Sequence, residues 1–172
     1  MKTLRWLCAV ALAVVIVPGV GAQEGPKPGP EHEALKKTEG TWETTMKFGG
    51  MESKGTTVYK MDLGGLWRVG SLESELFGTK FQGKGMDSYD PASKKYVSYW
   101  FDSMGSRPVV MEGTFDEGKK VLTLAGEGPG MDGKPSKYKS TTEMADNDTI
   151  NFTMWMGDGK DPAFTIVYKR KK

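Results

Sequence analysis

The stretch from Lys95 to Met104 combines aromatic side chains with one carboxylate, and a small-molecule site is built from such residues. Its Val, Tyr, Trp and Phe residues suit the pleated, packed surface of a β-strand. Side chains alternate between the two faces of a strand, so one face is predicted to carry Tyr96, Ser98, Trp100, Asp102 and Met104. An acidic group among aromatic rings needs neighbours that cover it, so the rest of the chain is expected to be organised around this strand.

A candidate ligand cavity follows from the residues expected to face the same interior. Apolar walls with a few polar groups are typical of small-molecule sites. A guanidinium can hold a carboxylate or another polar head group, which makes Arg68 and Asp102 candidate anchors. For these two, a structural ion pair or two exposed groups is the favoured alternative, and the apolar set can equally pack as a filled core. The predicted lining residues are Trp42, Met46, Trp67, Arg68, Trp100, Asp102, Met104 and Met111.

Catalytic groups are not indicated by the pattern. Glu73, Glu75 or Glu112 would have to meet Asp102 to form an acid–base pair, and strand alternation does not bring them together. The chain has one histidine, His32, which is expected on the surface of a short helix. No Ser–His–Asp arrangement is therefore available, and no catalytic residue is predicted.

Metal and cofactor sites are not predicted either. The only cysteine, Cys8, lies in an apolar leader, so the mature chain has no thiolate for catalysis or metal binding. Ten of the eleven methionines follow that leader. Thioethers bind copper(I), but a soft, adaptable apolar lining is the favoured interpretation of these residues.

The first 22 residues have the features of a cleavable secretory signal peptide. Lys2 and Arg5 form a basic start, residues 7–17 are an uncharged apolar run, and Val20-Gly21-Ala22 supplies a small-residue cleavage site. We therefore expect a secreted or periplasmic protein with no membrane span after cleavage. The oligomeric state is not predicted.

The net charge of the mature chain excludes nucleic acid as an expected partner. The whole chain has 24 basic and 22 acidic residues, and removing Lys2 and Arg5 leaves 22 of each. A formally neutral chain lacks the positive field that binds phosphate backbones. A small apolar or amphipathic molecule is the partner that we expect instead.

The remaining sequence predicts one all-β domain. Residues 23–30 form a Pro/Gly-rich linker, and residues 31–172 form the domain, which begins with a short helix over 31–37. Short turns, including a tight hairpin at Gly78-Thr79, separate about ten predicted strands, and no crossover helix intervenes. Such a sequence favours an antiparallel up-and-down barrel, which closes its own edges, with the helix capping one end. The predicted strands are 41–48, 54–61, 66–77, 80–89, 95–103, 109–115, 120–127, 136–144, 149–156 and 163–169.

Two motifs connect this barrel with known proteins. Gly40-Thr41-Trp42, directly after the helix, resembles the Gly-x-Trp opening of lipocalin-like (calycin) barrels, in which the Trp closes one end. The order and spacing of Leu63-Gly64-Gly65, Trp100 to Met104 and Glu112-Gly113-Thr114 resemble the bacterial family called domain of unknown function 1579. That resemblance implies a calycin-type barrel and a secreted location, and it brings no catalytic residues.

Three hypotheses about function remain open at this stage. The first is a barrel that binds a small apolar or amphipathic ligand, with Trp42, Trp67, Trp100 and Met111 as its wall. The second is a hydrolase or isomerase that uses carboxylates inside the barrel. The third is a filled barrel with a structural or interaction role. The size of the interior and the grouping of its titratable residues discriminate between them.

Overall fold

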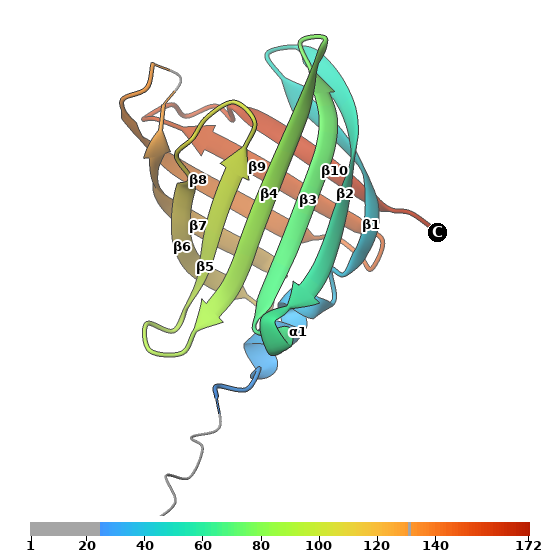
Figure 1. Cartoon of the computed structure of the whole chain (residues 1–172), viewed down its shortest axis with the longest axis vertical. Coiled ribbons are helices and arrows are strands. Elements are labelled where there is room, and N and C mark those ends of the chain that lie inside the picture. The colour runs from blue at the N-terminus through green and yellow to red at the C-terminus, as the bar shows by residue number, and fades with distance from the viewer. Residues whose placement is uncertain (1–24, 131) are drawn as a thin grey trace, which may run out of the picture.

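The structure is a computed structural model that describes residues 25–172 except residue 131. It contains one short α-helix, α1 (Pro30–Lys36), and ten strands. Each strand pairs antiparallel with the next in sequence, and β1 pairs with β10, so the sheet closes on itself (Figure 1). The predicted antiparallel up-and-down barrel with one short helix is confirmed.

The strands follow the predicted ones to within a few residues. The largest difference is the start of β2 at Met51, because Gly49 and Gly50, both at positive φ, complete the turn from β1 in two residues. The strands are β1 (Gly40–Phe48), β2 (Met51–Asp62), β3 (Trp67–Leu76), β4 (Thr79–Asp90), β5 (Lys95–Asp102), β6 (Val109–Asp116), β7 (Val121–Pro129), β8 (Pro135–Met144), β9 (Thr149–Met156) and β10 (Phe164–Arg170).

The segment before α1 has no regular structure where it is described. Residues 25–29 form neither helix nor strand, and the predicted signal peptide, residues 1–22, lies outside the described residues. Pro30 stands in the first turn of α1, where its missing N–H group costs no hydrogen bond. Within residues 25–172, leaving out 131, no helix is long and apolar enough to cross a membrane.

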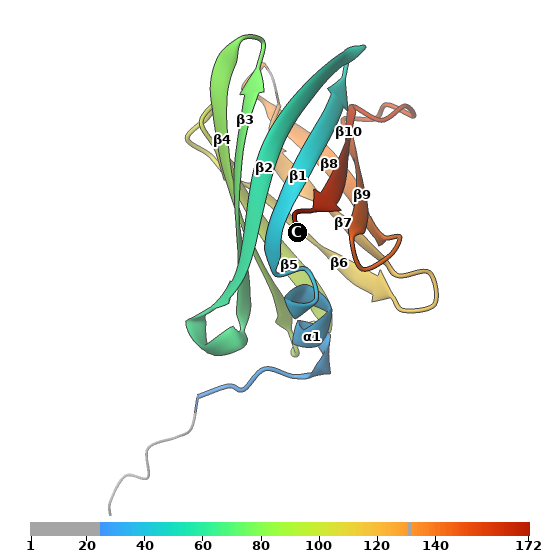
Figure 2. The same cartoon turned by 90° about the vertical axis from the view of Figure 1, so that its right-hand side faces the viewer.

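The barrel has two unlike ends. We call the end covered by α1 the helix end; the β2–β3, β4–β5, β6–β7 and β8–β9 connections also lie there. The opposite, open end carries the β1–β2 and β3–β4 hairpin turns and the longer β5–β6, β7–β8 and β9–β10 loops. Figures 1 and 2 show α1 at one end and the two hairpin tips extending furthest at the other.

The core consists of inward-facing residues that alternate with outward-facing ones along each strand. Leu35 of α1 is 2 % exposed and packs among them, which fixes the helix to the barrel. A fully buried side chain of this size stabilises the fold by about 1.5–3 kcal/mol. The two buried clusters are Leu35, Tyr96, Met111, Leu122, Leu124, Tyr138 and Met154, and Trp42, Ile150, Ile166 and Tyr168.

Candidate functional site

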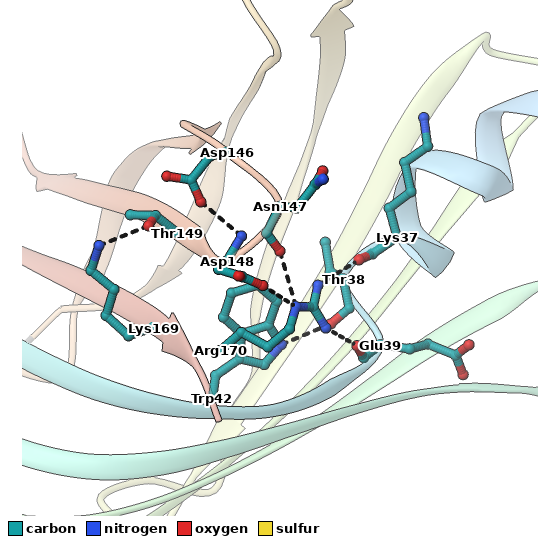
Figure 3. A network of polar contacts seen from close by, with 10 residues as sticks. All are labelled: Lys37, Thr38, Glu39, Trp42, Asp146, Asn147, Asp148, Thr149, Lys169 and Arg170. Carbon is teal, nitrogen blue, oxygen red and sulfur yellow. Dashed lines mark hydrogen bonds and ion pairs between the residues drawn. The ribbon is translucent and has the colours of Figure 1, made fainter. Parts of the chain in front are cut away.

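The helix end is sealed by Arg170, near the end of β10. Its Nη1 donates to the carbonyl of Glu39 at 2.5 Å and its Nη2 to the carbonyl of Lys37 at 2.9 Å. Its Nε donates to the carbonyl of Asn147 at 2.9 Å, and Asp148 pairs with it at 3.3 Å (Figure 3). One guanidinium therefore joins the segment that follows α1 to the β8–β9 turn, and it satisfies the carbonyl of Lys37, the C-cap residue that the helix terminus leaves unpaired.

Trp42 completes this seal from β1. Its indole is 1 % exposed, its Nε1 donates to the carbonyl of Thr38 at 2.9 Å, and the Arg170 guanidinium lies 4.1 Å from its ring centroid. Gly40 has a φ of 126°, and a Cβ there would lie 2.9 Å from Arg170 Nη1. The Gly-x-Trp motif is thus explained by geometry, because glycine leaves room for the guanidinium that covers the Trp ring.

A buried ion pair lies inside the barrel below this seal. Arg68 on β3 stands directly opposite Asp87 on β4, and its Nη2 and Nε donate to Asp87 Oδ2 at 2.8 and 3.2 Å. Its Nη1 donates to Thr38 Oγ1 at 2.9 Å, and the Tyr59 ring lies 4.4 Å below the guanidinium. Arg68 therefore does not pair with Asp102, which was one of the alternatives left open by the sequence, because the β3–β4 register places Asp87 opposite it.

Electrostatics around Arg68 show how closed this region is. Burial by itself lowers the pKa of Arg68, but Asp87 and Tyr59 outweigh it, and the pKa lies above its ordinary value. Burial also raises the pKa of the Tyr59 phenol and places that of Tyr168 well above its ordinary value. The charge of Arg68 is therefore already balanced inside the protein, and no charge remains to attract an anionic head group.

The open end differs because its inward-facing residues remain half-buried. Met46, Phe48, Trp100 and Asp102 point inward by strand alternation and all keep partial exposure. The inner rim of β1, β2 and β3 encloses a hollow of about 330 Å³ whose lining includes Met46, Phe48, Met51, Leu76 and Phe77. Inward-facing apolar side chains at this end are therefore in contact with solvent, whereas Trp42 at the helix end is buried.

Asp102 and Trp100 form a unit on the wall of the open end. Trp100 Nε1 donates to Asp102 Oδ2 at 2.9 Å, and the backbone N–H of Met104 donates to Asp102 Oδ1 at 2.9 Å. The indole packs on β4, where a Cβ at Gly83 would lie 2.2 Å from its Cζ2. The absence of a side chain at Gly83 thus leaves room for the indole, which holds Trp100 and its carboxylate partner against the inside of the sheet.

The remaining predicted lining residues do not form one wall. Met111 is 5 % exposed in the core, and Ser140 Oγ lies 4.0 Å from its sulfur. Met104 is 69 % exposed in the loop after β5. Trp67 faces outward, with its ring 6.0 Å from that of Tyr99. Trp67 therefore does not line the interior, because it neighbours Arg68 and adjacent strand residues point to opposite faces.

Sequence reasoning missed three residues of the interior. Asp87, the partner of Arg68, was not considered, although its position opposite Arg68 follows from the hairpin register. His32 was expected on the surface but is 6 % exposed; its Nδ1 accepts from the N–H of Gly29 at 3.0 Å. His32 Nε2 and Thr57 Oγ1 are buried without a hydrogen-bond partner among residues 25–130 and 132–172. The burial of His32 could have been inferred from the predicted docking of the helix on the barrel, because a docked helix buries one of its faces.

The acidic residues do not assemble a catalytic pair or a metal site in the described part of the chain. Glu112 binds Lys95 on the outside of the barrel, and Glu73 Oε1 accepts from Gln82 at 3.2 Å on an exposed face. Glu75 is likewise exposed, so none of the three faces Asp102. No group of three or more His, Cys, Asp or Glu side chains with metal-binding geometry occurs among these residues.

A second hollow, larger than the one at the open end, lies outside the barrel and away from these groups. It has a volume of about 430 Å³ and lies against β2 and β3, over residues that include Val58, Val69 and Ser71. These residues alternate with the inward-facing Thr57 and Arg68, so the hollow belongs to the outer surface. Volume alone therefore does not locate the site, and the inward-facing open end is the better candidate.

Comparison with known proteins places the chain in a family without an assigned function. Among solved structures, a de novo designed fluorescence-activating β-barrel has a TM-score of 0.48 and 14 % identity, covering 80 % of this chain and 97 % of its own. A redesigned β-barrel has a TM-score of 0.45 and 15 % identity, covering 81 % and 96 %. No curated protein matches the sequence. The model of the family described as "Protein of unknown function (DUF1579)" matches residues 27–170, and the chain belongs to this family.

Proposed function

We propose that this protein is a secreted or periplasmic barrel that binds a small apolar or amphipathic molecule through its open end. The observation that carries the proposal is the exposed apolar rim of the hollow at the open end. Trp42 at the helix end is 1 % exposed, whereas Phe77 and Met51 at the open end are 63 % and 49 % exposed. Single exposed apolar residues are common on protein surfaces, but contiguous exposed apolar patches mark interaction sites.

The shape of the open end supports a small molecule as the occupant. The hollow there has a volume of about 330 Å³, at the lower end of the range of about 300–1,000 Å³ typical of ligand pockets. The rings of Phe48 and Phe77 meet edge to face with centroids 6.0 Å apart, so they form one continuous apolar rim. Methionines adapt to varied apolar shapes, and Met46 and Met51 line the same hollow.

The proposed location rests on the leader, residues 1–22. Its basic start, apolar run and small-residue cleavage site are those of a secretory signal peptide. Expression of the full chain in a bacterial host, followed by intact-mass measurement of the periplasmic fraction, tests this. The expected product begins at Gln23. A full-length product that stays in the cytoplasm would exclude export.

Ligand binding is tested with the Phe77→Ser variant. Native mass spectrometry and tryptophan fluorescence titration with dodecanol, an uncharged amphiphile, measure binding to the purified mature protein. We expect Phe77→Ser to weaken dodecanol binding at least several-fold. The matched control is Val110→Ser, which removes an apolar side chain that is 41 % exposed on the outside of β6. Saturable binding that is unaffected by Phe77→Ser, or no binding at all, would contradict the proposal.

A further inference from the structure

The inward-facing charges of the barrel differ in how they are balanced. Arg68 and Asp87 neutralise each other at 2.8 Å and are 8 % exposed each. Asp102 accepts hydrogen bonds only from uncharged donors, the Trp100 indole and the backbone of Met104. Among residues 25–130 and 132–172, no lysine or arginine nitrogen pairs with Asp102. The open half of the barrel therefore presents an inward carboxylate without a counter-charge.

The surroundings of Asp102 are aromatic and apolar. Because Gly83 and Gly85 have no side chains, the Trp100 indole can pack directly against β4. Its Nε1 donates to the Asp102 carboxylate. Across the barrel, Tyr138 on β8 is 8 % exposed, and its hydroxyl donates to the carbonyl of Pro129 at 2.5 Å. Burial and, secondly, the negative charge of Asp102 raise the pKa of Tyr138.

The wall between Trp100 and Tyr138 is built from small residues and is closely packed. Trp100 on β5 stands opposite Val109 on β6, and the β7 positions that follow around the wall are Gly126 and Gly128. A Cβ at Gly128 would lie 2.8 Å from Val109 Cγ2 and 3.2 Å from Tyr138 Cε2. The part of this wall that reaches the mouth of the barrel is Asp102 with its Trp100 partner, and a carboxylate beside an indole matches the chemistry that recognises an organic ammonium group.

We propose that the open end selects amphiphiles that carry a cationic amine, with Asp102 as the counter-charge and Trp100 as the aromatic contact. The apolar tail then lies along the Met46 and Phe48 side of the mouth. A carboxylate at the same place is disfavoured, because Asp102 repels it and Asp87 has already neutralised Arg68. This inference rests on the proposed function and deepens it, because it names the charge of the ligand.

The test compares three amphiphiles that share a twelve-carbon tail and differ in charge. Dodecyltrimethylammonium, dodecanol and dodecyl sulfate are titrated below their micelle concentrations into the mature protein, and binding is followed by calorimetry and native mass spectrometry. In the unmodified protein we expect dodecyltrimethylammonium to bind about tenfold more tightly than dodecanol, an advantage in the range of a partly desolvated cation–aromatic and carboxylate contact. Dodecyl sulfate is expected to bind most weakly.

Asp102→Asn is the decisive variant, because it removes the charge and keeps an acceptor for Trp100 Nε1. It is expected to abolish the advantage of dodecyltrimethylammonium while leaving dodecanol binding unchanged. The matched control is Asp158→Asn, the same charge change at an exposed residue in the β9–β10 loop of the same end. That variant is expected to retain the preference.

The outcomes separate the two proposals. If dodecanol binds and the charge of the head group makes no difference, or if Asp158→Asn reduces the preference as much as Asp102→Asn, the role of Asp102 is overturned and the binding function stands. If none of the three amphiphiles binds, both proposals fail. The melting temperature of Asp102→Asn is expected to lie within a few degrees of that of the unmodified protein, which shows that the variant is folded. The Asp102→Glu variant keeps the charge and is expected to keep a measurable preference for dodecyltrimethylammonium.

Discussion

The two ends of the barrel use polar groups in opposite ways. At the helix end, Arg170, Arg68 and Asp87 are paired or hydrogen-bonded with other protein groups, and Trp42 is covered on both faces. At the open end, Phe77 and Met51 are exposed, and Asp102 lacks a counter-charge among the described residues. The comparison teaches that balanced charges are concentrated at the first end, whereas an inward carboxylate without a counter-charge lies at the second, where a ligand can use it.

The largest loss of stability is expected from Asp87→Ala. The variant leaves the Arg68 guanidinium buried without its counter-charge, which costs about 3–5 kcal/mol of unfolding free energy. Urea unfolding followed by tryptophan fluorescence measures the change. The double variant Arg68→Met/Asp87→Leu is the control and is expected to recover most of the loss, since an apolar pair replaces both charges. A single variant within about 1 kcal/mol of the unmodified protein would show that the pair is hydrated.

Arg170→Ala is expected to rank second, at about 2–4 kcal/mol, because hydrogen bonds from a charged donor contribute about 1.5–3 kcal/mol and the cation–π contact about 1. The variant also leaves the carbonyls of Lys37 and Glu39 without this donor. Equilibrium unfolding and hydrogen exchange of α1 measure it. Lys172→Ala, an exposed cation beyond β10, is the matched control. Unchanged exchange in α1 would contradict the role of Arg170 as the link between helix and barrel.

A pH dependence is expected from the buried tyrosines. Burial raises the pKa of Tyr96 to about 12 and also raises those of Tyr59 and Tyr168, whereas tyrosines of the unfolded chain titrate near pH 10. The folded protein holds more protons than the unfolded chain above pH 10, so the free energy of unfolding falls as the pH rises from 10 towards 12. Urea midpoints across this range measure the fall. Tyr96→Phe should make it shallower, and an unchanged slope would contradict the assignment.

The smallest effect on stability is expected at the open end. Met51→Ser removes an apolar side chain that is 49 % exposed, and such surface substitutions change the unfolding free energy by about 0.5 kcal/mol or less. The same variant should weaken dodecanol binding, because Met51 lines the hollow. Thermal melting and calorimetry on one preparation separate the two effects. A stability loss as large as that of Arg170→Ala would remove the contrast between the ends.

The elements of the fold could be predicted from the sequence because their signals are local. Alternation and Gly-containing turns predicted all ten strands. The docking of the helix at one end of the barrel followed from its weak apolar face, since a helix of that length is not stable alone.

The partners inside the barrel could not be predicted, because they depend on register. The sequence favoured a hairpin turn at Gly78-Thr79, which would place Arg68 opposite Tyr89. The structure turns at Phe77-Gly78, with both residues at positive φ, and Arg68 stands opposite Asp87. Phe is an unusual residue for that conformation, and a shift of one residue in the turn moves the partner by two. In this turn the ring of Phe77 contacts that of Phe48 on β1, a tertiary contact that the sequence does not reveal.

The pairing of β1 with β10 sets the order in which the barrel can form. Neighbouring hairpins need only nearby chain, but Arg170 reaches carbonyls 131 and 133 residues earlier in the sequence. Contacts so distant in sequence slow folding, because the intervening chain must be ordered first. A folding chain can hold hairpins without a finished closure, and both edge strands stay unpaired until β10 is in place. The addition of the last strand is therefore the step that turns an open, aggregation-prone sheet into a sealed barrel.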